Sequence, residues 1–275
     1  MKQQRYNLVP WLWVSGSVLA ALLTGCGSGS GPGPVATQQE LGRRLFFDER
    51  LSSSGTMSCA TCHSPDAGFA DPRKDSPVSH GAIPARVGDR NAPSAAYAAY
   101  SPSPRYFDPT PLTGNMMMGW YVGGQFWDGR ADSLEDQAKG PLLNPVEMNN
   151  ADAAAVVSEV RSGPLAGLFR EVFGSGALND VQTAFNHLVH AMAQYERSSQ
   201  VCRFSSKYDR YVAGSAELTP QEARGLALFK GSANCVECHS MDTSLAGKAL
   251  FTTYGYQNLG TPKTWASLGS GIRRW

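Results

Sequence analysis

The sequence predicts an all-α fold with long ordered loops, built from two related domains. Amphipathic segments with helix-capping residues recur along the chain, and no alternating strand pattern of useful length appears. The pattern Gly-x-x-Leu-Phe occurs at residues 42–46 and again at 225–229, each time shortly before a Cys-x-x-Cys-His sequence. A unit that recurs in this way indicates two related domains.

Capping residues and apolar spacing locate the individual helices. Each Gly-x-x-Leu-Phe segment reads as an amphipathic helix whose Leu and Phe face a core. The second of these helices begins at 219–222, where Thr, Pro, Gln and Glu combine an N-cap, a first-turn proline and a capping-box acid. Between residues 66 and 125 the chain is rich in Pro, Gly, Ser and Asn, so ordered loops are expected. Further helices are expected at 133–139, 151–161, 165–173 (with Gly174 as its C-cap) and 180–197.

The first 26 residues read as an export signal and are excluded from the fold. Lys2 and Arg5 precede an apolar run that is short for a transmembrane helix, which is the plan of a secretory signal. The run ends in Leu-Thr-Gly-Cys, which resembles the lipobox of bacterial lipoproteins, where the cysteine is acylated. Residues 27–38 begin with GSGSGPGP and read as a flexible linker. We therefore expect a periplasmic protein held at a bacterial membrane by lipid on Cys26.

Composition bounds the remaining possibilities. The 275 residues are 42% apolar and 17% charged, enough for a real core and one or two domains. The formal net charge is +1, so no field of one sign indicates a nucleic-acid partner.

Four of the six cysteines form two Cys-x-x-Cys pairs, and a histidine follows each pair directly. In a c-type haem site the two thiols bond to the haem vinyl groups and the histidine binds the iron. Zinc would want four ligands closer together in the sequence, and a redox pair would want a βαβ setting that is not seen. We therefore predict two covalent haems, each in a cytochrome c-like domain, bound by Cys59, Cys62 and His63 and by Cys235, Cys238 and His239. Cys202 is left over and reads as a small buried hydrophobe.

The stretch between the two haem motifs carries further motifs. Arg-Asn-Ala-Pro stands at 90–93, FWDGRA at 126–131 and Pro-Val-Glu-Met at 145–148, and YGYQNLGTP follows at 254–262. On these motifs, residues 41–262 resemble the bacterial diheme cytochrome c peroxidase and MauG family. The resemblance implies a peroxidatic haem domain at 39–200 and an electron-transfer haem domain at 201–275.

The resemblance also implies roles for residues at the first haem. Cleavage of peroxide needs a base that takes a proton from one oxygen and returns it to the leaving oxygen. Glu147 matches the family's acid-base carboxylate, and Gln137 matches the residue beside it that orients peroxide or water. Trp127 matches the tryptophan that couples the two haems for electron transfer, and a plain core aromatic is the alternative. Arg90 and Arg130 suit haem propionates, and structural salt bridges are equally well supported.

Two metal assignments depend on the resemblance as well. His80 lies in the loop that in many relatives supplies a second ligand to the first haem iron, and a ligand and an ordinary loop histidine both stay open. Asn91 matches a calcium ligand of the family, which makes calcium a further candidate cofactor.

Beyond Pro262 the sequence departs from the family. Residues 263–275 match nothing in the segment that, in the family, carries the Met or Tyr on the distal side of the second haem and part of the calcium site. A shifted reading frame or an early stop is our hypothesis for this ending, and we expect the second domain to be incomplete. Met241, Tyr254 and Tyr256 are the nearest local substitutes for the distal ligand.

The resemblance implies an enzyme, a cytochrome c peroxidase. It would reduce hydrogen peroxide to water with electrons from a small c-type cytochrome or a cupredoxin that enter at the second haem. Two alternatives stay open, a MauG-like oxidase acting on a protein or organic substrate and a truncated electron-transfer protein without turnover. Homodimers are common in the family.

Overall fold

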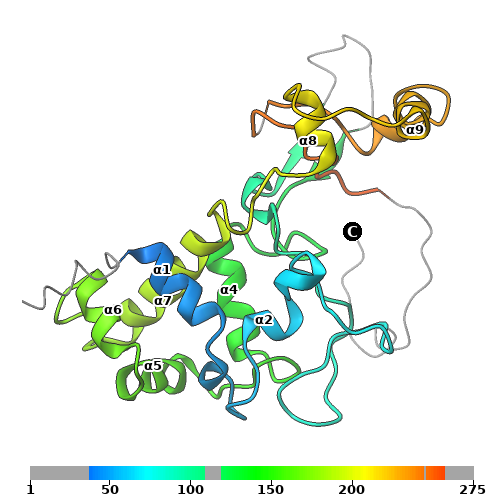
Figure 1. Cartoon of the computed structure of the whole chain (residues 1–275). Helices are drawn as coiled ribbons and strands as arrows, with labels where there is room; N and C mark the ends of the chain where they lie inside the picture. Colours follow the sequence, from blue (N-terminus) through cyan, green and yellow to red (C-terminus); the bar gives the residue numbers. More distant parts are fainter. Residues whose placement is uncertain (1–36, 109–118, 245, 258–275) are drawn as a thin grey trace, which may run out of the picture. The chain divides into compact units, whose positions relative to one another are not determined.

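The computed structural model describes residues 37–108, 119–244 and 246–257 (Figure 1). This part of the chain is mostly helical, with one small antiparallel sheet, which confirms the all-α prediction. Single-turn 3-10 helices stand at Glu49–Leu51, Pro65–Ala67, Ala98–Tyr100 and Cys235–Glu237. The helices are α1 (Gln38–Phe46), α2 (Cys59–Cys62), α4 (Leu134–Leu143), α5 (Ala153–Ser162), α6 (Ala166–Phe173), α7 (Val181–Glu196), α8 (Lys207–Val212) and α9 (Pro220–Lys230), and the strands are β1 (Arg105–Phe107) and β2 (Trp120–Val122).

Helix α1 packs along α7, and this pair is the centre of the first half of the chain (Figure 1). The hydroxyl of Thr37 accepts a hydrogen bond from the Glu40 backbone N–H and so caps α1, which starts inside the expected linker. Gly42 faces α7 so closely that an added Cβ would overlap the backbone carbonyl of Ala191. The glycine of the first Gly-x-x-Leu-Phe pattern is therefore required by helix packing.

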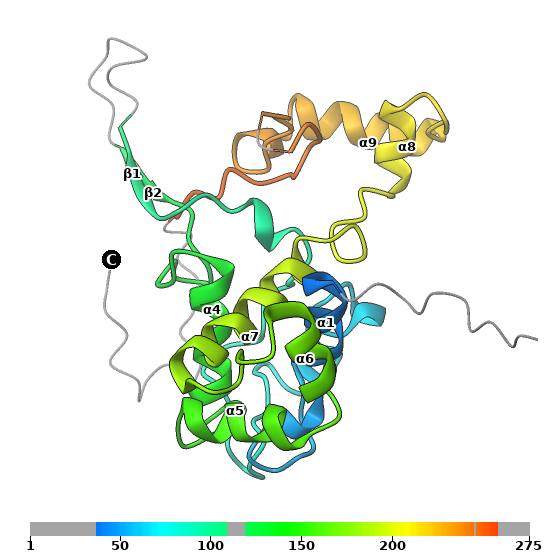
Figure 2. The same ribbon diagram turned by 90° about the vertical axis from the view of Figure 1, so that its left-hand side faces the viewer.

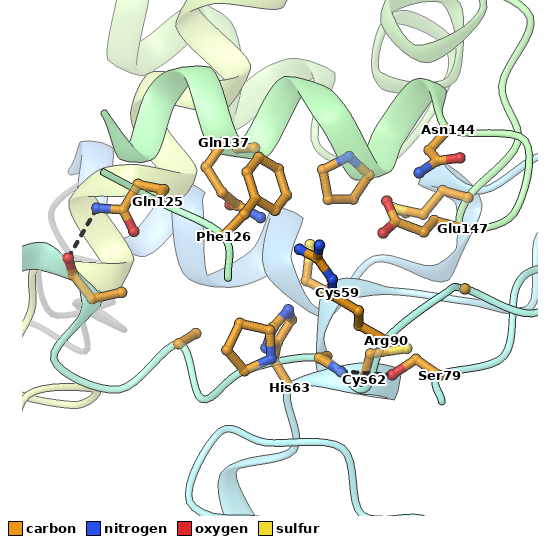
Figure 3. A pocket seen from close by; sticks show the side chains of 18 of the residues that line it. Cys59, Cys62, His63, Ser79, Arg90, Gln125, Phe126, Gln137, Asn144 and Glu147 are labelled. Atoms are coloured by element: carbon orange, nitrogen blue, oxygen red, sulfur yellow. Dashed lines mark hydrogen bonds between the residues drawn. The ribbon is translucent and has the colours of Figure 1, made fainter. Parts of the chain in front are cut away.

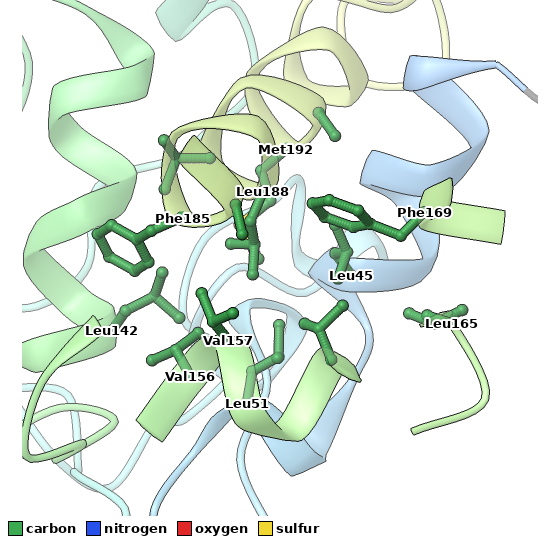
Figure 4. Packing of buried hydrophobic residues seen from close by; sticks show 14 of the residues in the cluster. Leu45, Leu51, Leu142, Val156, Val157, Leu165, Phe169, Phe185, Leu188 and Met192 are labelled. Carbon is green, nitrogen blue, oxygen red and sulfur yellow. The ribbon is translucent and has the colours of Figure 1, made fainter. Parts of the chain in front are cut away.

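The main hydrophobic core lies between α1, α4, α5, α6 and α7 (Figure 4). Close packing of these apolar side chains is the principal stabilising contribution in this half. Its members include Leu45, Leu51, Leu142, Val156, Val157, Phe169, Phe185, Leu188 and Met192. A second cluster forms around Phe46, Phe69 and Tyr195 and includes Val201 and Cys202, so the buried position expected for Cys202 is observed. Both Val201 and Cys202 pack with the first half, just beyond the expected boundary at residue 200.

The predicted helices α5, α6 and α7 appear within two residues of their expected ends, whereas α4 is longer than expected. The helix was expected to end at Lys139, but α4 continues through Gly140 and Pro141 to Leu143. Proline removes one backbone hydrogen bond from a helix without making a further turn impossible. Here the carbonyl of Pro141 accepts a hydrogen bond from the Met148 backbone N–H at 3.0 Å, which ties the helix end to the following turn.

The second half of the described chain contains α8 and α9 and has little core of its own. Helix α8 was not predicted, although Ser206 and Asp209 form a capping box at its start. None of the described residues after Cys202 is fully buried. The rings of Tyr208 and Phe229 lie 5.0 and 5.8 Å from that of Phe251 and form a small aromatic cluster.

The internal repeat extends to tertiary contacts. Helix α9 has the predicted capping box of Thr219 and Glu222, as α1 has its Thr cap. The phenylalanine that ends each Gly-x-x-Leu-Phe pattern meets a second phenylalanine edge to face. The ring centroids of Phe46 and Phe69 are 6.4 Å apart, and the second-half pair described above repeats this arrangement. Both halves are therefore built on the same local plan.

A short hairpin, visible in Figure 2, was not predicted from the sequence. Strands β1 and β2 pair antiparallel, with Tyr106 opposite Tyr121. The tripeptide 254–256 from the end of the described chain adds to β2, since the Gly123 N–H donates to the Tyr254 carbonyl at 2.9 Å. The Tyr256 hydroxyl then donates to the Gly123 carbonyl at 2.9 Å. Three-residue strands are too short to show an alternating pattern.

The expected signal, Cys26 and the C-terminal segment from residue 258 lie outside the described residues. Within the described ranges, no helix is both long enough and apolar enough to span a bilayer.

Candidate functional site

A cavity of about 530 Å³ opens between α2, the loop at residues 79–95, α4 and the end of α7 (Figure 3). We call it the haem cavity. Its volume lies in the range of cofactor sites, roughly 300–1,000 Å³. Figure 3 shows Cys62 and His63 on one side and Gln137, Phe126 and Glu147 facing them from the side of α4.

The first Cys-x-x-Cys-His motif forms the lower wall of the haem cavity. Ser58 and Thr61 make a capping box at the start of α2, whose single turn places Cys59 and Cys62 on the cavity. The His63 Nδ1 lies 3.2 Å from the carbonyl oxygen of Phe69. A proton on Nδ1 would be donated to that carbonyl, and Nε2 would then be free to bind a metal.

The chemical state of these groups fits a covalent haem. Burial raises the pKa of the Cys59 thiol to about 12 and lowers the pKa of the His63 imidazole, so both are neutral near pH 7. Neutral imidazole is the form that binds iron. Among the described residues, no group of three or more His, Cys, Asp and Glu side chains is arranged to hold a free metal ion. Two thiols and an oriented imidazole on one large cavity therefore suit a haem.

The second motif repeats the histidine geometry. Its cysteines stand on the 3-10 turn Cys235–Glu237 and just after it, and the His239 Nδ1 lies 3.1 Å from the carbonyl oxygen of Phe251. Phe69 and Phe251 both have a left-handed backbone, with φ of 59° and 55°. The spacing from histidine to phenylalanine differs between the halves, so no fixed interval in the sequence could have revealed these two partners.

The upper wall of the haem cavity carries the predicted acid-base pair. Ser133 caps α4 and thereby fixes the start of the helix that presents Gln137. A turn follows the helix, closed by the Glu147 backbone N–H, which donates to the Asn144 carbonyl at 3.0 Å. Gln137 and Glu147 thus reach the same cavity from α4 and the turn after it (Figure 3).

The surroundings of Glu147 perturb its carboxyl group. Burial raises its pKa above 4.5, and the charge of Asp89 adds to this effect. The charge of Arg130 and a hydrogen bond from the Asn144 side chain oppose it by lowering the pKa. A carboxyl group whose pKa is raised is a stronger base when ionised and can return the proton that it has taken up.

The two arginines predicted to bind haem propionates both form salt bridges with the same residue, Asp128. Arg90 lies 3.2 Å and Arg130 lies 2.7 Å from the two oxygens of Asp128. Burial opposes ionisation of Asp128, but these two arginines hold its pKa below the usual value. Arg130 also stacks on the Phe126 ring at 3.6 Å. The structural salt bridges that were the alternative to propionate binding are therefore present. Both arginines also line the haem cavity, so binding of the haem propionates stays a prediction.

His80 lies on a loop attached to the turn that carries Glu147. Its side chain is exposed at the edge of the haem cavity. The Ala82 backbone N–H donates to the Glu147 carbonyl at 2.7 Å, and a Cβ on Gly81 would overlap the Val146 carbonyl. Iron ligation by His80 stays a prediction.

Trp127 and Asn91 are joined by a hydrogen bond. The Trp127 indole N–H donates to the Asn91 backbone carbonyl at 2.7 Å, and the tryptophan side chain is 57% exposed among the described residues. Trp127 lines the haem cavity and is therefore not a plain core aromatic. Its role in electron transfer and the calcium role of Asn91 stay predictions.

A buried carboxyl group at the haem cavity was missed by sequence reasoning. Glu196, at the end of α7, is 7% exposed and lines the cavity near Cys59. Burial raises its pKa to about 8, the charge of Arg197 opposes this effect and that of Glu135 adds to it. The sequence signal that could have identified Glu196 is its position four residues after Met192, which places it on the apolar face of α7.

Comparison with known proteins identifies the family. A family model described as di-haem cytochrome c peroxidase matches residues 36–217. The methylamine utilization protein MauG of Paracoccus denitrificans is 41% identical over 227 residues, which cover 81% of this chain and 56% of that protein. The cytochrome c551 peroxidase of Pseudomonas aeruginosa is 33% identical, with 79% of this chain and 54% of that protein covered.

Solved structures give the same result. The diheme peroxidase BthA of Burkholderia thailandensis matches with a TM-score of 0.70 and 38% identity, covering 79% of this chain and 53% of that one. The chain thus spans about half the length of the relatives it matches. The structural neighbours have two cytochrome c-like domains, as predicted from the sequence. The chain therefore belongs to the di-haem cytochrome c peroxidase and MauG family, and its cofactors are two covalently bound c-type haems.

Proposed function

We propose that this protein reduces hydrogen peroxide to water at its first haem, with Glu147 as the acid-base group. The observation that carries the proposal is the position of Gln137 and Glu147, which face Cys62 and His63 across one cavity (Figure 3). Cys59 and Cys62 would hold the first haem and His63 would bind its iron. Cys235, Cys238 and His239 would do the same for the second haem.

The protein's contribution to the reaction is the binding and movement of protons. A haem bound here supplies a redox-active iron that binds peroxide and delivers electrons. Reduction of one peroxide to two waters consumes two electrons and two protons. The Glu147 carboxylate would take the proton from one peroxide oxygen and return it to the other oxygen, which then leaves as water. The Gln137 amide can donate and accept hydrogen bonds and so orients the peroxide beside Glu147.

Electrostatics at the upper wall support this role. Burial raises the pKa of Glu147, which makes its carboxylate a stronger base toward the peroxide proton. Arg130 keeps the carboxylate accessible because its positive charge favours the ionised form.

We further propose that electrons come from a small c-type cytochrome or a cupredoxin, enter at the second haem and pass near Trp127. The protein would work in the periplasm, lipid-anchored through Cys26, and homodimerisation would follow the habit of the family.

A MauG-like oxidation of a protein or organic substrate is the second candidate. The identity to the Paracoccus MauG, 41%, exceeds that to the Pseudomonas peroxidase, 33%. Both activities would use the same cavity and differ in what is oxidised. Reduced cytochrome should be consumed at two equivalents per peroxide by a peroxidase, whereas a MauG-like enzyme would consume it slowly or not at all.

The test uses the full chain, exported in a host that matures c-type cytochromes. A haem-stained gel and the intact mass give the number of haems, and peroxide turnover is followed with a reduced small cytochrome. Glu147→Gln should abolish turnover and keep both haem spectra. The matched control is Glu171→Gln, an exposed glutamate on α6 outside the haem cavity. Equal turnover in wild type and Glu147→Gln would remove Glu147 from the mechanism.

A further inference from the structure

A second cavity, of about 400 Å³, lies against the haem cavity on the side of Glu147. We call it the outer cavity. Ala131, Asp132, Asp136 and Gly140 belong to the outer cavity alone. Four side chains line both cavities and form the wall between them: Phe126, Arg130, Asn144 and Glu147.

The wall is held by specific contacts. Arg130 stacks on the Phe126 ring at 3.6 Å and is itself fixed by Asp128 at 2.7 Å. Phe126 has a φ of 67°, a left-handed conformation that is uncommon for a phenylalanine. Gly140 lacks the Cβ that would come within 3.1 Å of the Phe126 ring. Backbone, cation and glycine together keep this ring between the two cavities.

The outer cavity has the chemistry of a passage for small neutral solutes. Its polar lining comes from Arg130, Asn144 and three carboxyl groups, those of Asp132, Asp136 and Glu147. Asp136 is already paired with Lys139 at 3.0 Å and bonded to Ser133. This lining holds no excess of positive charge that would select an anion, and it offers hydrogen bonds to water and to neutral hydroperoxides.

We propose that the outer cavity is the entrance through which peroxide reaches the first haem site, with the Phe126 ring and Arg130 as its gate. The proposal rests on the function proposed above and adds the route. A haem bound by Cys59, Cys62 and His63 would fill the haem cavity from its lower wall. Glu147 belongs to both cavities, so a solute that crosses the wall arrives directly at the carboxyl group that must accept its proton.

The test measures cyanide binding to the oxidised holoprotein by stopped-flow absorbance. All variants carry His80→Gly, so that release of a histidine from the iron cannot limit the rate. Asp132→Trp places a large ring at the exposed mouth of the outer cavity, and Phe126→Ala opens the wall. Glu171→Trp is the matched control, because Glu171 is exposed and lines neither cavity.

A gate changes the barrier and leaves the bound state unchanged. Asp132→Trp should therefore slow association and dissociation of cyanide several-fold and equally, with an unchanged dissociation constant. Phe126→Ala should speed association. The route is overturned if the association rate of Asp132→Trp equals that of Glu171→Trp, or if only its association rate falls while dissociation does not. Because cyanide binding needs no turnover, a protein without peroxidase activity that keeps this kinetic pattern would refute the proposed function and support the entrance.

Discussion

Replacement of Glu196 by glutamine should make the protein more stable at alkaline pH. The Glu196 carboxyl is buried at the haem cavity, and burial raises its pKa from 4.5 to about 8. In the unfolded chain the same group is exposed and titrates near its ordinary pKa, about 4.3. Between these two values the folded protein holds a proton that the unfolded chain has released. The free energy of unfolding must therefore fall as pH rises through this window.

The size of the effect follows from the shift in pKa. Each unit is worth about 1.4 kcal/mol. The difference between 4.5 and about 8 thus corresponds to a loss of about 5 kcal/mol between acid and alkaline pH. Glutamine has nearly the same shape, carries no charge and does not titrate, so Glu196→Gln should remove this loss. Below pH 4.5 the wild-type group is neutral in both states, and the variant gains nothing there.

The assay is urea unfolding of the holoprotein at a series of pH values from 4 to about 9, which spans the pKa of the folded state. The quantity compared is the difference in unfolding free energy between Glu196→Gln and wild type, in which the titration of all other groups largely cancels. Glu171→Gln, at an exposed position, supplies the baseline. A difference that stays constant over the whole series would show that Glu196 ionises normally and that its burial has been misjudged.

Three further changes test the site and the packing. If Glu147 acts as a base, turnover should rise with pH through a pKa above 4.5, because burial raises the pKa of this group, and Glu147→Gln should lose that limb; a limb that persists belongs to another residue. His80→Gly should alter the resting spin state of one haem in the electron paramagnetic resonance spectrum if His80 binds the iron, and an unchanged spectrum would reject it as a ligand. Gly42→Ala should lower the unfolding free energy by about 1–3 kcal/mol, since its Cβ would overlap the Ala191 carbonyl. The equivalent Gly225→Ala should not, since no described atom lies within 4 Å of its Cβ position; equal losses in thermal denaturation would contradict this reading.

The helices could be predicted because their signals are local. Thr219 with Glu222, Asp180 and Gly174 act on backbone groups within a few residues, and the structure contains the corresponding caps. Helix α8 carried the same kind of signal and was overlooked. The end of α4 depends on a non-local contact, the hydrogen bond between Pro141 and Met148, which no local rule contains.

The site residues were predicted by motif, and their partners were not. Cys59, Cys62 and Glu147 stand in motifs, and the structure brings them to one cavity. Glu196 reaches that cavity from α7, which follows the first haem motif by more than a hundred residues, so its contact with the site is a property of the fold. The Phe69 carbonyl lies within hydrogen-bonding distance of the His63 ring, and the Phe69 backbone is left-handed. A phenylalanine in the sequence does not predict this backbone conformation.

The two halves of the chain differ in how much hydrophobic core surrounds their haem-binding motifs. In the first half, α1 and α7 bury a core against which Cys59 packs, so the walls of the haem cavity have support from the protein itself. In the second half the described side chains around His239 are exposed or half-buried, and Leu228 of the repeat is 55% exposed where its counterpart Leu45 is fully buried. A haem adds a large apolar surface, and burial of such a surface stabilises in proportion to its area. Attachment at Cys235 and Cys238 should therefore matter more for the order of its surroundings than attachment at the first motif.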